Sequence, residues 1–280
     1  MYHLVGGRLN TMKAKIKIVI DGIFIPFILF VGITVFVTFI YVLMNIVMRT
    51  IMGETIDFTS AEAISGNINA VLVQGIADIV LIPILVILYK KFKEKNELTT
   101  GPFRIKDFLY VTPIAFSVCI ICNILIGLLP IPKANAVSEE IFKLIEEYNI
   151  FVSLFIVSVL VPIVEELLFR GFFYDSITLI SNHLVAIIIT SILFGLIHMN
   201  IEQGIYGIVA GLFLGYIKYK YNRLSYTIFM HLLMNFSSIV FIPSITLLDG
   251  VKERLYIVFI CLALLFFTLY RMNMENKKEI

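Results

Sequence analysis

Residues 164–171 read Val-Glu-Glu-Leu-Leu-Phe-Arg-Gly and place two carboxylates and a guanidinium inside a sequence that is otherwise hydrocarbon. The apolar run before them, residues 150–164, is interrupted only by Ser153, Ser158 and Pro162. An aspartate, lysine or arginine at the centre of a membrane helix costs about 2.5–3.5 kcal/mol on insertion scales. Two adjacent glutamates in such a setting therefore indicate a function.

The whole chain has the composition of a polytopic membrane protein. Of its 280 residues, 60% are hydrophobic and 15% are charged, whereas soluble domains are about 45–50% apolar and about 25% charged. The formal net charge of +2 gives no reason to expect a nucleic-acid partner. The three cysteines predict no disulfide framework, because Cys119 and Cys122 lie within an apolar run that has no βαβ pattern around it.

We predict an all-α membrane bundle of about eight transmembrane helices, because long apolar runs without alternation can satisfy their backbone groups in lipid only as helices. The expected spans are 18–48, 68–89, 108–129, a span from about 149 that carries the Glu-Glu motif towards its end, 184–199, 205–219, 226–242 and 255–270. Residues 136–148 have the pattern of a short amphipathic surface helix.

The distribution of basic residues predicts the orientation of the bundle. Lysines and arginines cluster before the first span, at 90–106, around 218–223 and at 271–278. The positive-inside rule then predicts that the N- and C-termini are both cytoplasmic. We expect no cleavable signal peptide, because the first apolar run is too long for one. Translation could begin at Met1 or at Met12, and the sequence does not decide between them.

Helical geometry predicts different surroundings for the two glutamates of the motif. Glu166 and Arg170 are four residues apart and share a helix face, so they can form an ion pair. Glu165 points about 100° away from Glu166 and has no such partner, which leaves its carboxylate free to face a cavity. The alternative is that all three charges form one ion-pair network that only stabilises helix packing.

Two further polar intrusions fall on later spans. His198 ends the fifth apolar run, and His231 and Asn235 share a face of the seventh because they are four residues apart. His198 could instead be an interfacial residue, and His231 with Asn235 could be a hydrogen-bonded contact between helices. We interpret Asp78, in the second span, as a partner for a polar group of a neighbouring helix.

A carboxylate, two imidazoles and an amide drawn from different helices are suited to activating water. Glu165 could take a proton from water, one histidine could orient that water, and the other histidine with Asn235 could stabilise an oxyanion. The set Glu165, His198 and His231 would also suit a catalytic zinc with an open position, so zinc-activated water and Glu/His-activated water both remain open. Glycines at 207, 211 and 215 should let the sixth span approach another helix closely.

These residues resemble the type II CAAX prenyl endopeptidase and bacteriocin-processing family, called CPBP or Abi. Its Glu-Glu-x-x-x-Arg motif is similar to residues 165–170, its Phe-x-x-x-His motif to 194–198, and its His-x-x-x-Asn motif to 231–235. The resemblance implies water activation by Glu165 and His198, oxyanion stabilisation by His231 and Asn235, and support from Glu166 and Arg170. Family members are described both as metalloproteases and as metal-independent glutamate proteases, so the resemblance leaves the metal open.

The resemblance covers about residues 150–245 and suggests a division of the chain. Residues 1–149 would be N-terminal membrane helices with the surface helix, 150–245 the intramembrane protease core, and 246–280 the last membrane helix with a cytoplasmic tail. The family's turn before the last motif often reads Thr-Gly-Ser-Leu-Trp, whereas residues 221–225 here read Tyr-Asn-Arg-Leu-Ser. Asn222 can still adopt a left-handed conformation, so we expect the turn to be retained.

The sequence therefore predicts a multi-pass enzyme of the cell membrane that hydrolyses a peptide bond in a lipidated or membrane-embedded peptide, such as a CAAX-type substrate or a bacteriocin or pheromone precursor. The alternatives are a proton-coupled transporter that uses the same Glu and His residues, and a non-catalytic membrane scaffold. The expected boundaries raise one conflict. Glu165 and His231 fall near the cytoplasmic ends of their spans, whereas His198 falls about 20 Å away near an outer end. A later start of the fifth span, around Ile189, or strong helix tilt would resolve it.

Overall fold

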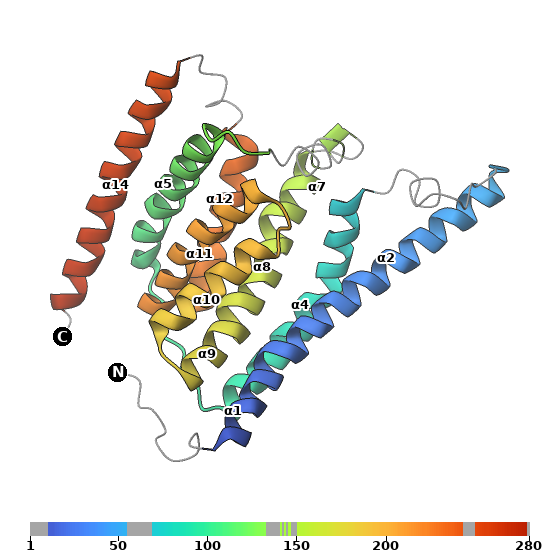
Figure 1. The fold of residues 1–280 in the computed structure, drawn as a ribbon, viewed down its shortest axis with the longest axis horizontal. Coiled ribbons are helices and arrows are strands. Elements are labelled where there is room, and N and C mark those ends of the chain that lie inside the picture. Colours follow the sequence, from blue (N-terminus) through green and yellow to red (C-terminus); the bar gives the residue numbers. More distant parts are fainter. Residues whose placement is uncertain are drawn as a thin grey trace.

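Helices make up the regular structure of the part of the chain that the computed structural model describes, namely residues 11–54, 69–132, 150–242 and 250–278, with 141, 143, 145 and 146 (Figure 1). In chain order the helices are α1 (Met12–Val19), α2 (Ile25–Ile51), α4 (Ala70–Lys95), α5 (Phe108–Gly127), α7 (Ile150–Phe155), α8 (Val161–Glu166), α9 (Tyr174–Ile180), α10 (His183–Leu196), α11 (Ile201–Tyr221), α12 (Leu224–Val240) and α14 (Val251–Lys278).

The predicted all-α membrane bundle is confirmed. Each of the predicted spans falls on one of these helices, and 5 helical segments of the described part are long and apolar enough to cross a membrane. The short apolar helices α10 and α12 and the longer α11 account for the other predicted spans. The number of crossings and the side of the termini stay predictions, as does the division into three segments. The predicted surface helix at 136–148 falls mostly outside the described residues.

The helix that carries the Glu-Glu motif is longer than the sequence suggested. It runs without interruption over 31 residues, Ile150–Ile180, so Glu165 lies at its middle and not towards its end. The sequence boundary was misplaced because Glu165, Glu166 and Arg170 lowered the apparent hydropathy of residues that are in fact buried. Every residue from Leu167 to Tyr174 is buried.

Two wide helical turns, with backbone bonds from residue i+5 to residue i, precede prolines in the same way. The turn η1 (Ile20–Phe24) precedes Pro26, and η3 (Ile156–Leu160) precedes Pro162. A proline has no N–H and its ring clashes with the carbonyl four residues earlier, so a wider turn relieves the clash. A third such segment, η4 (Leu167–Phe173), follows the two glutamates and contains Gly171. The catalytic candidate Glu165 and its neighbour Glu166 therefore lie between two wide turns.

The two largest of four apolar clusters hold most of the described helices together. One joins α5 with α11, α12 and α14, with fully buried residues such as Ile114, Leu214 and Met230. The other joins α4 to residues 164–173 and to Phe194 of α10. In Figure 1, α14 and the long helix that includes α2 lie at opposite edges of the bundle. The Glu-Glu motif therefore lies at the centre, where the second cluster meets α10, α11 and α12.

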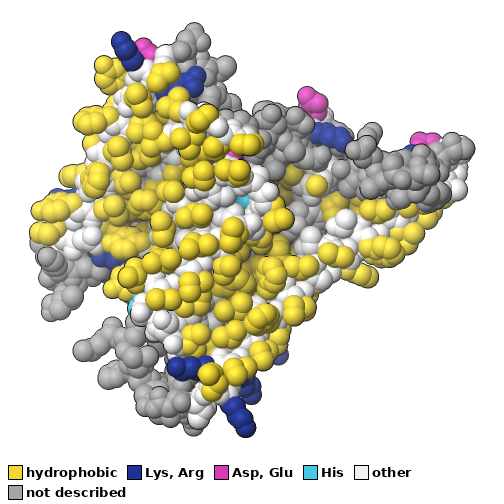
Figure 2. Space-filling view, viewed as in Figure 1, with side chains coloured by type: hydrophobic (Ala, Val, Ile, Leu, Met, Phe, Trp, Pro, Cys, Tyr) yellow, Lys and Arg dark blue, Asp and Glu magenta, His cyan; other side chains and the backbone are white. Residues whose placement is uncertain are grey.

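The surface of the molecule is that of a membrane protein. Figure 2 shows hydrophobic side chains over its lateral face, with charged side chains mainly towards the ends. Large apolar residues such as Ile28, Phe36 and Phe39 of α2 are more than half exposed. Because apolar side chains in such a band are stable only against lipid, the chain is a multi-pass membrane protein.

Helix ends are defined by asparagines in the part of the chain that leads to the site. Asn182 caps α10 and Asn200 caps α11, each through a side-chain oxygen that accepts a backbone N–H. Asn222 ends α11 with φ 47° and ψ 40°, so the predicted left-handed turn is confirmed. Of these residues, Asn200 lies in the turn between α10 and α11 that carries His198, and its Nδ2 also donates to the His198 carbonyl, at 2.9 Å.

Candidate active site

Glu166 and Arg170 form the buried ion pair that their spacing predicts. The Nη1 atom of Arg170 lies 2.8 Å from Oε1 of Glu166, and neither side chain is exposed. The guanidinium also donates through Nη2 to the carbonyl of Gly211, at 3.3 Å, and lies 4.5 Å from the centre of the Phe194 ring. The pair therefore anchors the motif to α10 and α11 through contacts that a lysine could not make together.

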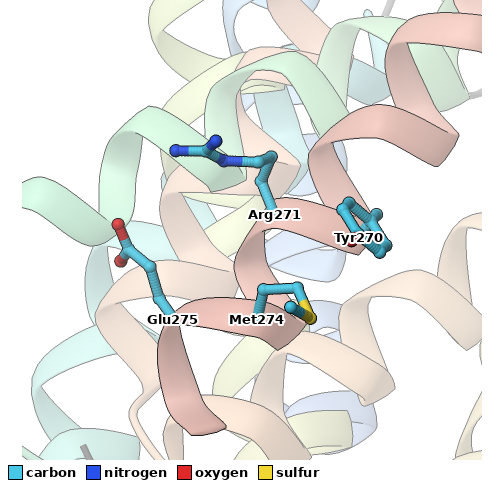
Figure 3. A pocket seen from close by; sticks show the side chains of 4 residues that line it. All are labelled: Tyr270, Arg271, Met274 and Glu275. Carbon is cyan, nitrogen blue, oxygen red and sulfur yellow. The ribbon is translucent and has the colours of Figure 1, made fainter. Parts of the chain in front are cut away.

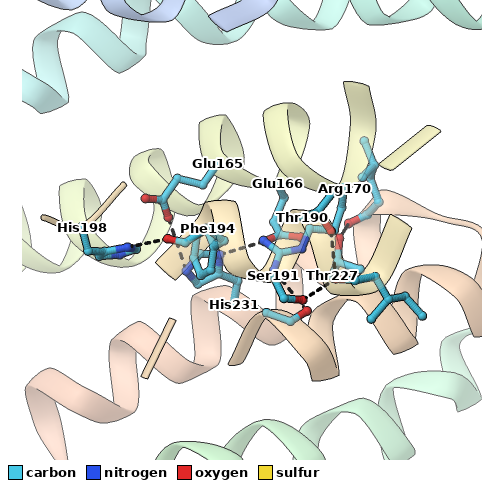
Figure 4. A network of polar contacts seen from close by, with 12 residues as sticks. Glu165, Glu166, Arg170, Thr190, Ser191, Phe194, His198, Thr227 and His231 are labelled. Carbon is cyan, nitrogen blue, oxygen red and sulfur yellow. Dashed lines mark hydrogen bonds and ion pairs between the residues drawn. The ribbon is translucent and has the colours of Figure 1, made fainter. Parts of the chain in front are cut away.

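His231 connects the two glutamates (Figure 4). Its Nδ1 lies 3.0 Å from Oε1 of Glu166, and its Nε2 lies 3.5 Å from Oε2 of Glu165. Because Glu166 is an acceptor held by Arg170, Nδ1 of His231 carries the donated proton, and Nε2 faces Glu165. The Glu165 side chain keeps 17% exposure, whereas Glu166 has none. The predicted division holds: Glu166 is neutralised locally and Glu165 remains accessible.

His198 belongs to the same site through Phe194. The Phe194 ring packs edge-on against His198 at 5.1 Å and against His231 at 5.5 Å between centroids. The Nδ1 atom of His198 lies 2.8 Å from the Phe194 carbonyl, which can only accept, so Nδ1 donates and Nε2 is left as an acceptor. Figure 4 shows His198 on the same side of the network as Glu165.

The long helix removes the conflict over the depth of His198. The chain reverses at Ser181 and Asn182, between α9 and α10. Glu165 lies 16 residues before Ser181 and His198 lies 16 residues after Asn182, so the two helical arms bring them to the same level. The contact between Phe169 and Phe194, at 5.3 Å, marks this register. Neither a late start of α10 nor strong tilt is needed, because α10 begins at His183.

Asn235 lies on the same face of α12 as His231 but points to another group. Its Nδ2 donates to the carbonyl of Val157, at 2.8 Å, in the wide turn η3. One of the two N–H donors of this amide is thus used in a contact with the helix backbone. The oxyanion role of Asn235 stays a prediction.

The glycine stripe of α11 packs against the helix that leads to His198. An added Cβ on Gly207 would lie 3.0 Å from Cα of Gly195, and one on Gly211 would lie 2.9 Å from Cα of Ser191. The close approach that the spacing predicted is therefore made with α10. It also places the Gly211 carbonyl within reach of Arg170.

A methyl group on this stripe should weaken the bundle. We expect Gly211→Ala to lower the melting temperature in detergent and to reduce activity, because overpacking costs about 1–3 kcal/mol when backbone must move. Gly32→Ala is the matched control, since nothing lies within 4 Å of an added Cβ there. Thermal unfolding of both variants checks the prediction, and equal melting temperatures would contradict it.

The partner predicted for Asp78 is wrong. Asp78 was interpreted as the partner of a polar group on a neighbouring helix, but Gln74 of its own helix donates to Oδ1, at 2.7 Å. The side chain is fully buried, and Oδ2 has no hydrogen-bond partner among the described residues. It lies within electrostatic range of Glu165. The signal available in the sequence was the carboxylate itself, at the centre of an apolar span.

The choice between zinc-activated water and Glu/His-activated water stays a prediction. Both nitrogens of His231 face carboxylates, and the carboxylate of Glu166 is held by Arg170. Within the described residues no group of at least 3 His, Cys, Asp or Glu side chains is arranged to hold a metal ion. The contact of His231 with Glu165 would allow a proton to pass between them.

Two surface depressions lie away from these residues. One is lined by Tyr270, Arg271, Met274 and Glu275, all on the last turns of α14 (Figure 3). The other runs along the second half of α4 and reaches Leu167, next to Glu166. Neither is lined by a candidate catalytic residue.

Comparison with known protein families gives a match for the part of the chain that holds these residues. Residues 147–237 match the model of a family described as Type II CAAX prenyl endopeptidase Rce1-like. This range contains all six of the residues Glu165, Glu166, Arg170, His198, His231 and Asn235. No curated protein and no solved structure shows a significant match to the chain.

Proposed function

Residues 147–237 belong to the type II CAAX prenyl endopeptidase Rce1-like family, a family of CAAX-type intramembrane proteases, and from this premise we propose that Glu165, His231 and His198 hydrolyse the peptide bond. The observation that carries the proposal is the contact of His231 with both glutamates, at 3.0 Å and 3.5 Å, of which Glu165 is accessible and Glu166 is not. A partly exposed carboxylate next to an imidazole has the geometry of a general base with a proton acceptor behind it.

The proposed reaction begins with water between Glu165 and His198. Nε2 of His198 accepts one hydrogen bond from the water and orients it, because Nδ1 is used by the Phe194 carbonyl. Glu165 removes a proton as the water oxygen forms a bond to the scissile carbonyl carbon. The proton then moves to the leaving amine as the C–N bond breaks, which returns Glu165 to its ionised form.

His231 supports both steps. Its Nε2 can share the proton that Glu165 has taken, and an Nε2–H can donate to the oxyanion that develops on the substrate. Glu166, which Arg170 holds in place, accepts from Nδ1 and fixes the ring orientation, in the way that a carboxylate orients the histidine of a hydrolase. The two glutamates thus have different tasks although they are adjacent in the chain.

We assign the substrate to lipidated or membrane-embedded peptides, either with a CAAX-type end or as precursors of secreted peptides. An apolar lateral surface around a central carboxylate suits a peptide that arrives through the bilayer. The N-terminal helices would set the substrate preference, since α4 packs directly against residues 164–173 and lies outside the matched range. The transporter and scaffold alternatives find no support in the family match.

A cleavage assay tests the proposal. The protein, purified in detergent, is incubated with quenched fluorescent peptides that end in Cys-aliphatic-aliphatic-X, with and without a farnesyl group on the cysteine. We expect cleavage by the wild type and loss of cleavage with His198→Ala. A panel that the wild type leaves intact would overturn the assignment.

The same assay decides the role of a metal. Because the nitrogens of His231 are both engaged by carboxylates, we expect cleavage to continue at an unchanged rate after treatment with a zinc chelator. Added zinc should not raise the rate. Inactivation by the chelator, reversed by zinc, would instead show a metalloprotease with Glu165, His198 and His231 as ligands.

A further inference from the structure

The contact between Asn235 and Val157 has a cause in the backbone. In η3 the N–H of Val161 bonds to the carbonyl of Ile156, five residues earlier, and not to that of Val157. In the same register the Val157 carbonyl would bond to the N–H of residue 162, which is a proline and has none. The Val157 carbonyl is therefore left without a backbone donor in a helix surrounded by apolar groups, where an unpaired carbonyl is strongly unfavourable.

Asn235 supplies the missing donor. Its Nδ2 lies 2.8 Å from the Val157 carbonyl. Asn235 lies one helical turn after His231 on α12, so the same helix face bonds Val157 and contacts both glutamates. The wide turn that Asn235 holds precedes α8, the short helix on which Glu165 lies.

The width of this turn sets the direction of Glu165. A wide turn accommodates one extra residue, so its conversion to a regular α-helical turn would rotate the residues after it by about 100°. Such a rotation would carry the Glu165 carboxylate away from His231. We infer that Asn235 is a positioning residue for the peptidase reaction, which acts by bonding the Val157 carbonyl that Pro162 leaves unpaired. This inference rests on the proposed function for its effect on cleavage, but its structural part does not.

A double-mutant cycle between Asn235 and Pro162 tests this role. Pro162→Ala adds an N–H that, in the register of the wide turn, gives the Val157 carbonyl a backbone donor without Asn235. The four proteins are the wild type, Asn235→Leu, Pro162→Ala and the double variant, and each is measured for melting temperature and for kcat and KM. Asn235→Ala repeats the cycle in case the leucine is not accommodated.

We expect Asn235→Leu to lower the melting temperature and to reduce kcat by about tenfold or more with KM unchanged, because a displaced catalytic group loses rate before it loses binding. In the Pro162→Ala background the same substitution should change kcat by less than about threefold and leave the melting temperature nearly unaltered. Pro26→Ala is the matched control, because Pro26 follows η1 as Pro162 follows η3. In that background Asn235→Leu should keep its full effect.

The other outcomes overturn the inference in distinguishable ways. An equal loss of kcat in both backgrounds would make Asn235 a direct oxyanion donor. If Asn235→Leu lowers the melting temperature only when Pro162 is present, but does not change kcat in either background, the contact serves packing alone. If the wild type cleaves no peptide, the proposed function fails, and the coupling of the two melting temperatures still decides whether Asn235 and Pro162 act on the same turn.

Discussion

Glu165→Gln is expected to give a folded protein that does not cleave peptide. The amide has nearly the shape of the carboxylate but cannot take a proton from water, so kcat should fall by about 10²–10⁴-fold, the usual contribution of a general base. The melting temperature should stay close to that of the wild type, because Glu165 is partly exposed and its nearest polar contact, with His231, is 3.5 Å long.

Glu166→Gln is the matched control for this prediction. It changes the neighbouring residue in the same way, but it leaves the fully buried Arg170 without its charged partner. We therefore expect the melting temperature to fall in this variant, in contrast to Glu165→Gln. If Glu165→Gln cleaves peptide at a rate within about tenfold of the wild type, Glu165 is not the general base.

Arg170→Met should have the largest effect on stability of any single change at the site. Arg170 and Glu166 are both inaccessible to solvent, and removing one partner of a buried pair leaves an uncompensated charge, which costs about 3–5 kcal/mol. The contacts of the guanidinium with the Gly211 carbonyl and the Phe194 ring are lost as well. Unfolding in mixed detergent micelles measures the change, and activity should fall because Glu165 lies on the same helix.

The double variant Glu166→Gln with Arg170→Met separates charge from packing. It removes both charges and keeps similar side-chain volumes, so it should be more stable than Arg170→Met alone. Activity should not return with stability, because Nδ1 of His231 then lacks the carboxylate that orients it. If the double variant is no more stable than Arg170→Met, the loss of stability comes from altered packing and not from the unpaired charge.

Much of the architecture follows from local patterns. The apolar runs have the length of membrane helices, and the structure places helices at each of them. The spacing of Glu166 and Arg170 is enough to predict their pairing, because residues four apart on a helix face each other wherever the helix lies. The left-handed conformation of Asn222 follows in the same way from the preference of one residue type.

Other features depend on contacts between segments that are distant in the sequence. The common level of Glu165 and His198 depends on where the chain reverses, and the polar motif hid the continuation of its helix to Ile180. The glycine stripe could have packed against any neighbouring helix. The contacts of Phe194 with Arg170, His198 and His231 form only when the helices pack together. The spacing could not show these contacts because it fixes a face of a helix and not the helix opposite.

Glu165 and Asn235 show what the sequence determines and what the packing of the helices determines. The residue types and their order established a membrane helix bundle with one free and one neutralised glutamate, because hydrocarbon solvent and helical geometry act locally on any chain. Packing determined what the free glutamate faces and where the amide of Asn235 donates. The reason is that Pro162 removes a backbone donor, and which side chain replaces that donor depends on the helix that packs beside it.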